Sequence, residues 1–294
     1  MRVLNICFVF LSFVSLSCSS IDEPPFIGTN NSEKIDTIYF NVTKIMDLTS
    51  HKKSSYTQSM SVYNDNAFIF YTGGYCKIID LKNRQELKEA TLASQSKSNH
   101  VNNAMFSNIF FSAEDKYPLL YISPYAYQTC YVERYLEEEN RFELIQTIKV
   151  STSQYNDEYG EFVIDEDKGL LYDLTFPSTK ADNSHIKIFN LPQMDFQQVT
   201  LTDNDLIDIK TIQLDYPNIL QGALYHNGYI YMLFGNQSTN KQLYCVDTNS
   251  FNYYIYDYTK FFNGVEPEDI SIYRDSCITC TNHPKAIWNL FKCY

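Results

Sequence analysis

Three stretches of the sequence repeat one short pattern: a strand, a two-residue turn and a second strand. The three units are Gln58–Tyr71, Gln221–Leu233 and Glu268–Cys280, with turns at Asn64-Asp65, Asn227-Gly228 and Arg274-Asp275. Asn, Asp and Gly are the residues that tight hairpin turns favour. Self-similarity at a period of roughly 40–55 residues is typical of a β-propeller, because one four-stranded blade cannot bury its faces alone.

Two further units fit the pattern more loosely, over residues 103–145 and 161–213. The last unit has three strands before Tyr294, whereas Thr37–Val42 stands as a lone strand near the N-terminus. Pairing these ends would complete the last blade and remove the exposed edges of an open array. We therefore predict an all-β, five-bladed propeller in a single domain over residues 36–294. A six-bladed ring and a two-sheet sandwich are the alternatives.

Charge and composition limit the classes of partner. The formal net charge is −12, and Lys52-Lys53 is the one basic cluster. Binding to nucleic acid is improbable, because it requires Lys and Arg to neutralise phosphates. The chain also contains 25 Tyr and 20 Phe but one Trp. Tyr and Phe favour strands, which agrees with an all-β fold.

The first eighteen residues have the organisation of an export signal. Arg2 is followed by the apolar run Val3–Val14, and small residues then surround Cys18. This run is too short for a membrane-spanning helix of ~20 residues. We predict a signal peptide at residues 1–17 and lipidation of Cys18, although Ser15 stands where the lipobox pattern usually has Leu. The alternative is a free or disulfide-bonded Cys18 after ordinary cleavage.

Residues 18–35 are predicted to be a flexible acidic tether. The segment Ser19–Pro25 is polar, acidic and stiffened by two prolines, a composition that remains solvated. Acidic residues directly after the cysteine resemble the surface-export signals of Bacteroidetes lipoproteins. The expected location is the outer membrane, facing the cell exterior, with its periplasmic face as the alternative. Contact with the membrane is expected through the lipid alone, because no other long apolar run follows.

Six of the eight cysteines remain after removal of Cys7 with the signal and Cys18 with the lipid. The pair Cys277 and Cys280 lies on a predicted strand, where residues three apart point to opposite faces. The two thiols are therefore not expected to converge on a metal. We predict buried cysteines or an occasional disulfide, and neither a metal centre nor a cofactor.

Several blade starts resemble those of the TolB-like propeller lipoproteins of Bacteroidetes. The segments that carry the resemblance are Gln58–Tyr63, His100–Ala104, Asp115–Tyr121 and Glu266–Tyr273. The resemblance covers most of residues 36–294 and implies a propeller fold and a lipoprotein address, not a reaction centre. Ser59 and Asp269 depart from the glycine that such blade starts often carry, as at Gly222. That position is therefore not expected to require a positive φ, unless Asp269 tolerates one.

The first strand of each blade lines the channel of a propeller, so equivalent residues at its start should surround one mouth. The candidate ligand-binding residues are Gln58, Gln221 and Glu268, with His100, Asn102, Asn103, Glu158 and Tyr159 by looser alignment. Their amides and carboxylates predict binding of a glycan, peptide or protein partner by a monomeric, non-catalytic protein. The alternative interpretation is that these residues are polar because the channel holds water.

A second hypothesis is a cell-surface hydrolase or lyase acting on polysaccharide. Glycoside cleavage requires two carboxyl groups across a cleft, for which Glu161 and Glu268 are the candidates. Five-bladed glycosidases usually carry an early Asp on the first inner strand, where this chain has Gln58-Ser59-Met60. Non-catalytic binding is therefore the first hypothesis.

Overall fold

The structure is a computed structural model that describes residues 40–95, 100–125, 127–155, 159–176, 183–194, 198–214 and 218–292. The predicted signal peptide, Cys18 and the tether lie outside the described residues. Within the described part, no helix is long and apolar enough to cross a membrane.

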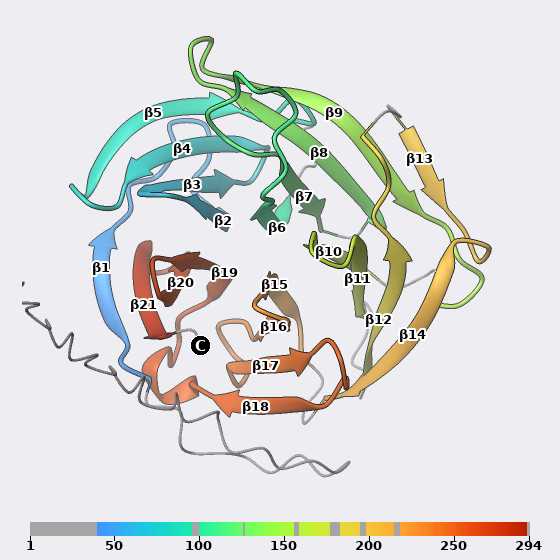
Figure 1. Cartoon of the computed structure of the whole chain (residues 1–294). Coiled ribbons are helices and arrows are strands. Elements are labelled where there is room, and N and C mark those ends of the chain that lie inside the picture. The colour runs from blue at the N-terminus through green and yellow to red at the C-terminus, as the bar shows by residue number, and fades with distance from the viewer. Residues whose placement is uncertain are drawn as a thin grey trace, which may run out of the picture.

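Five antiparallel sheets surround a central axis, so the predicted five-bladed propeller is confirmed (Figure 1). Blades 1 and 2 are formed by β2 (Thr57–Tyr63), β3 (Asn66–Tyr71), β4 (Tyr75–Asp80) and β5 (Gln85–Thr91), and by β6 (Val101–Phe106), β7 (Leu120–Pro124), β8 (Thr129–Leu136) and β9 (Arg141–Val150). Blade 3 is formed by β10 (Tyr159–Asp165), β11 (Leu170–Phe176), β12 (Asn183–Asn190) and β14 (Leu206–Gln213). Blade 4 is formed by β15 (Leu220–His226), β16 (Tyr229–Phe234), β17 (Gln242–Asp247) and β18 (Tyr253–Asp257). A 3-10 turn, η1 (Thr259–Phe261), leads to blade 5, which is formed by β19 (Pro267–Tyr273), β20 (Ser276–Thr281), β21 (Ala286–Lys292) and β1 (Thr43–Asp47).

The hairpin turns adopt the backbone that their residues favour. Asn64, Asn227 and Arg274 all have a positive φ, and Gly228 follows Asn227 with a positive φ of its own. These turns join the first and second strands of blades 1, 4 and 5, as the repeat predicts. The inner strands β2, β6, β10, β15 and β19 are almost wholly buried, whereas the outer strand β5 is largely exposed. Apolar residues between neighbouring blades form the core.

The ring closes through an N-terminal strand that completes the last blade. β1 pairs antiparallel with β21, and the two lie side by side at opposite ends of the colour scale in Figure 1. The predicted bounds of this strand were wrong. Residues 40–42 are not in a strand, residues 37–39 lie outside the described part, and pairing begins at Thr43. The physical reason is register: the residues that meet Asn289 to Ala286 across the sheet are Thr43 to Asp47.

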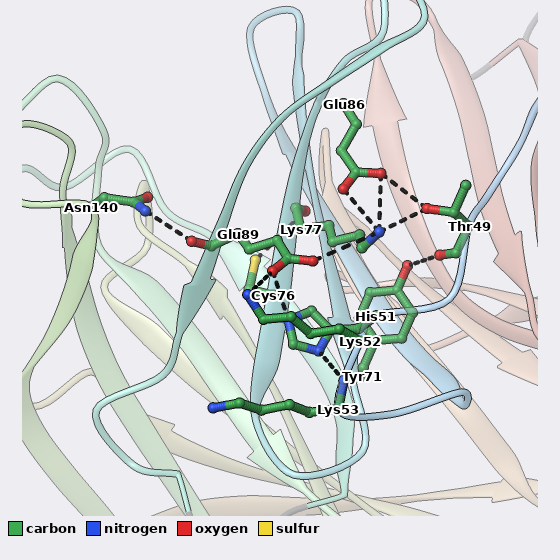
Figure 2. Close-up of polar contacts among 10 residues, drawn as sticks. All are labelled: Thr49, His51, Lys52, Lys53, Tyr71, Cys76, Lys77, Glu86, Glu89 and Asn140. Atoms are coloured by element: carbon green, nitrogen blue, oxygen red, sulfur yellow. Dashed lines mark hydrogen bonds and ion pairs between the residues drawn. The ribbon is translucent and has the colours of Figure 1, made fainter.

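Loop 48–54 leads from β1 to the centre of blade 1 and is held against that blade by buried polar contacts (Figure 2). The Lys77 ammonium, from β4, donates to Thr49 Oγ1 at 2.7 Å and contacts Glu86 Oε1 at 2.8 Å. The Tyr71 hydroxyl donates to the Thr49 carbonyl oxygen at 2.8 Å. The His51 ring stacks on Tyr75 with 4.9 Å between centroids. These contacts fasten the closing strand to the first blade.

One strand was not indicated by the sequence pattern. β13 (Gln198–Leu201) lies between β12 and β14 in the chain but pairs with β9 of blade 2. The pairing is parallel and gives blade 2 a fifth strand, visible at the outside of the ring in Figure 1. β13 therefore connects the outer edges of blades 2 and 3.

The cysteine pair Cys277 and Cys280 lies on β20, with its side chains on opposite faces as predicted. Cys277 packs with residues of blades 4 and 5, whereas Cys280 packs with residues of blades 5 and 1. Cys277 is disulfide-bonded and Cys280 is a free thiol, so the two are not bonded to each other. The prediction of buried strand cysteines with an occasional disulfide is therefore confirmed for this pair.

Candidate functional site

A repeated β-bulge places one polar side chain from each of four blades at the same mouth of the channel. The pairing of the inner strand with its neighbour shifts register at the second residue of β2, β6, β15 and β19. A bulge leaves one residue out of the ladder and re-aims its side chain, and bulges are common beside functional sites. The bulged residues are Gln58, Asn102, Gln221 and Glu268. In blade 3, β10 pairs without a shift and has Gly160 at the corresponding place.

These four side chains line a cavity of about 480 Å³, which we call the mouth cavity. This volume lies within the usual range of small-molecule sites. His100 also lines it, so five of the predicted ligand-binding residues meet there. The remaining lining residues are Tyr56, Thr72, Tyr125, Ile219, Gln237, Glu266, Asn282 and His283. Most of these lie in loops, where strand periodicity provides no signal for them.

Two amide oxygens of the mouth cavity have no hydrogen-bond partner. Gln58 donates from Nε2 to the Thr57 carbonyl oxygen at 2.8 Å, but its Oε1 is buried and unbonded. The Oδ1 of Asn282 is likewise buried and unbonded. Gln58 and Asn282 are each 4% exposed. Buried polar atoms are nearly always bonded, so these two acceptors indicate a place for a donor from a ligand or water.

The Glu268 carboxyl group lies in an environment that disfavours its charged form. Burial raises the pKa of Glu268 well above its ordinary value, and the neighbouring Glu266 and Asp269 raise it further. Glu266 accepts a hydrogen bond from Gln221 Nε2 at 3.2 Å. Burial also lowers the pKa of His100, which favours the neutral imidazole. Burial therefore disfavours the charged forms of both Glu268 and His100 in this cavity.

A second layer of side chains closes the channel beneath the mouth cavity. Asp269 accepts backbone N–H bonds from Met60 at 3.1 Å, Ala104 at 3.2 Å and Ile270 at 2.7 Å. Asn103 donates to the Phe162 carbonyl oxygen at 3.0 Å and accepts from the Ala223 N–H at 2.9 Å. The two residues thus bond to inner-strand backbones of all five blades. Both are fully buried, so this layer separates the mouth cavity from the other end of the channel.

Two predicted site residues, Asn103 and Tyr159, have other positions, and a third is not among the described residues. Asn103 belongs to the second layer, and both ends of its amide are bonded there. Tyr159 does not line the mouth cavity, and its ring packs against Tyr125 and Phe176 with centroid distances of 4.8 and 5.6 Å. Glu158 lies outside the described residues.

The two predicted catalytic carboxyls occupy different layers. Glu268 lines the mouth cavity, whereas Glu161 is 1% exposed and does not line it. Glu161 Oε1 accepts a hydrogen bond from Asn102 Nδ2, which also donates to the Leu220 carbonyl oxygen at 3.1 Å. Burial raises the pKa of Glu161 well above its ordinary value. Its position in β10 corresponds to that of Asp269 in β19, one residue beyond the bulge.

A second cavity, of about 420 Å³, lies at the opposite ends of the inner strands. Its lining includes Ser61, Phe106, Glu166, Tyr225 and Ser271. Ser61 and Ser271 accept hydrogen bonds from the backbone N–H groups of Phe106 and Val62, at 2.9 and 3.0 Å. Among the described residues that line this opposite cavity, no buried side-chain acceptor lacks a hydrogen-bond partner, unlike in the mouth cavity.

Comparison with known proteins supports the fold. No family model matches the chain, and no curated protein matches it either. Among solved structures, it is similar to the crystal structure of Myxococcus xanthus glutaminyl cyclase. The TM-score is 0.51 and the identity 11%, over 85% of this chain and 95% of that chain. At this identity the likeness shows a β-propeller and carries no activity over to this chain.

Proposed function

We propose that the protein is a non-catalytic, lipid-anchored propeller that binds a glycan or peptide ligand in the mouth cavity. The observation that carries this proposal is the pair of buried, unbonded acceptors, Gln58 Oε1 and Asn282 Oδ1, in a cavity of suitable size. Concave sites with a few convergent polar groups are the usual form of small-ligand sites. The resemblance of the blade starts to TolB-like lipoproteins of Bacteroidetes supports the lipoprotein address of this proposal and not the choice of ligand.

The binding proposal is tested by screening the purified protein against a glycan array and a peptide library. Gln58→Met removes the free acceptor while keeping the length of the side chain, and should weaken binding of any hit about tenfold. Gln85→Met on the exposed strand β5 is the matched control and should leave affinity unchanged. Equal affinity of the two variants would place the ligand elsewhere. A screen without any hit would contradict the glycan and peptide proposal and direct the search to protein partners.

The anchor is proposed to be a lipid on Cys18, holding the propeller at the outer membrane with its free face toward the cell exterior. The sequence pattern of residues 1–25 supports this part of the proposal. In fractionated cells, Cys18→Ser should move the protein from the membrane to the soluble fraction. Protease added to intact cells should degrade the wild-type protein. Membrane association that survives the substitution would contradict lipidation, and protection from protease would favour the periplasmic face.

A polysaccharide hydrolase or lyase is the second candidate, favoured by one observation. Glu266 and Glu268 both line the mouth cavity, and glycoside cleavage uses two carboxyl groups of different protonation state. The pair Glu161 and Glu268 has less support, because Glu161 is buried outside the mouth cavity. Incubation with a panel of polysaccharides tests this candidate, since Glu268→Gln should abolish any activity found. Turnover that persists in this variant would exclude Glu268 as the acid.

A further inference from the structure

The mouth cavity offers acceptors and negative charge but little to bind an anion. Its ionisable carboxyls are Glu266 and Glu268, and its unbonded amide atoms are both oxygens. Within the described part of the chain, none of the lining residues is Lys or Arg. An acceptor-rich wall is complementary to a ligand that donates several hydrogen bonds from one centre.

Lys241, the cation whose charge interacts with Glu266, does not line this cavity. It is 1% exposed. Its ammonium donates to the carbonyl oxygens of Thr239 at 2.8 Å and Gln237 at 3.3 Å. The lysine is therefore bonded within its own loop, and the carboxyls at the mouth keep their capacity for a ligand.

Two pairs of aromatic rings also line the cavity. Tyr56 and His283 form one pair, with 6.3 Å between ring centroids. His100 and Tyr125 form the other, at 5.3 Å. The faces of such rings attract cations and pack against the apolar faces of sugar rings. The cavity thus combines polar acceptors with aromatic rings.

We propose that the mouth cavity recognises a primary ammonium group carried on a small polar body, with an unacetylated aminohexose as the best-fitting class. The ammonium donates to Gln58 Oε1, Asn282 Oδ1 and the Glu268 carboxylate, while the aromatic pairs contact the sugar ring. An ammonium has three donors and no acceptor, which matches this set of groups. This inference rests on the proposed function, because it names the ligand class of the same site.

Docking of a cation should also change the protonation of Glu268. An adjacent positive charge favours the carboxylate and lowers the pKa that burial raises in the empty cavity. Binding should therefore release a proton. The titratable groups that face Glu268 are Glu266, Asp269 and Cys280, with His100, His283, Tyr56 and Tyr125 around the cavity.

The test is calorimetric titration of the purified protein with matched probes that differ in one charge. Glucosamine should bind at least tenfold more tightly than glucose or N-acetylglucosamine, and the heat should vary with the ionisation enthalpy of the buffer as a proton is released. Trialanine with a free or an acetylated N-terminus distinguishes a peptide source of the ammonium from a sugar source. Calcium chloride is titrated in parallel, because carboxylates and amide oxygens also suit Ca²⁺.

Variants assign the effect to the cavity. Glu268→Gln removes the charge with little change of shape and should weaken glucosamine binding at least tenfold, and Glu266→Gln should weaken it several-fold. Glu166→Gln, the same change in the opposite cavity, should leave affinity unchanged. Thermal melting confirms that each variant is folded.

Three results would overturn the inference. Binding of glucose or N-acetylglucosamine as tight as that of glucosamine would refute recognition of the ammonium but leave binding of polar ligands intact. Binding of calcium alone, in a manner that depends on Glu268, would make the cavity a metal-cation site instead. Absence of binding by every ammonium probe also refutes the inference, and the array screen then decides the broader function separately.

Discussion

Gly222 shows how a single residue permits two blades to meet at the channel. A Cβ atom at this position would lie 2.3 Å from Asp269 Oδ1 and 2.7 Å from Asp269 Cα. Gly222 is not among the glycines with a positive φ, and neither Ser59 nor Asp269 has a positive φ at the corresponding place. As expected from the sequence, this position does not need left-handed backbone. Glycine is required in blade 4 because the backbone of blade 5 approaches it closely.

Gly222→Ala is expected to destabilise the protein by at least about 1–3 kcal/mol, the usual cost of forcing an extra methyl group into a packed interior. Urea unfolding followed by tyrosine fluorescence measures the change. Gly169→Asn is the control, since a Cβ there meets nothing within 4 Å and its φ of +64° lies near the left-handed region that Asn adopts. Its effect reports backbone strain without a close contact and should stay below about 1 kcal/mol. Equal effects of the two changes would contradict the role of close approach.

At the scale of the strands, side chains complete the hydrogen bonding of the inner edge of each blade. Inner strands present backbone N–H groups toward the channel, and an unpaired sheet edge is a liability. Asp269, Asn103 and Ser123 accept hydrogen bonds from such groups in other blades, and the bond to Asn103 joins blades 2 and 4 across the channel. The closing segment is attached in the same manner, because Lys77 joins loop 48–54 to β4 and β5 (Figure 2).

Lys77→Met should weaken the attachment of the closing strand. The Lys77 side chain is 6% exposed and its partner Glu86 is 39% exposed, so the pair is intermediate between a buried and a surface ion pair. We expect a loss of about 2 kcal/mol in the free energy of unfolding. Backbone amides of residues 43–47 should also exchange with deuterium faster. Lys88→Met on the neighbouring strand, whose side chain is 42% exposed, should change neither quantity appreciably. Unaltered exchange in β1 of the Lys77 variant would refute this role.

At the scale of the whole molecule, buried carboxyl groups near the axis couple stability to pH. Burial raises the pKa of Glu161 and of Glu268, so the folded protein retains protons that the unfolded chain releases above about pH 4.3. Since the folded state binds more protons, the stability from these groups is complete below that pH and is lost as the pH rises toward the folded pKa values.

The free energy of unfolding should therefore fall between pH 4.5 and pH 7.5, and Glu161→Gln should make this dependence shallower. The substituted amide cannot titrate and keeps an acceptor for Asn102 Nδ2. Urea unfolding at a series of pH values measures the slope, which is independent of any constant loss caused by the substitution. Glu139→Gln, on an exposed turn, is the control and should reproduce the wild-type slope. A variant slope equal to that of the wild type would show that Glu161 does not titrate in this range.

The sequence by itself determined the blades and their number. Hairpin turns such as Asn227-Gly228 and strands such as β16 depend on residues that are close in the sequence. They can therefore be predicted from the sequence alone. The same repeat also indicated the channel-facing starts of the inner strands, including Gln58, Gln221 and Glu268.

Only the tertiary structure decided which of these polar residues line the mouth cavity. Asn102 and Asn103 are consecutive, yet Asn102 lines the mouth cavity whereas Asn103 bonds to a neighbouring blade. The β-bulge at Asn102 determines which of the two faces the mouth. The loop residues Tyr56, Asn282 and His283 join the cavity because the blades close into a ring. The pairing of β13 also depends on the tertiary structure. Its partner strand lies about fifty residues earlier, and no local sequence pattern encodes such a contact. Strand periodicity depends on neighbours along the chain, whereas the cavity depends on how five sheets meet.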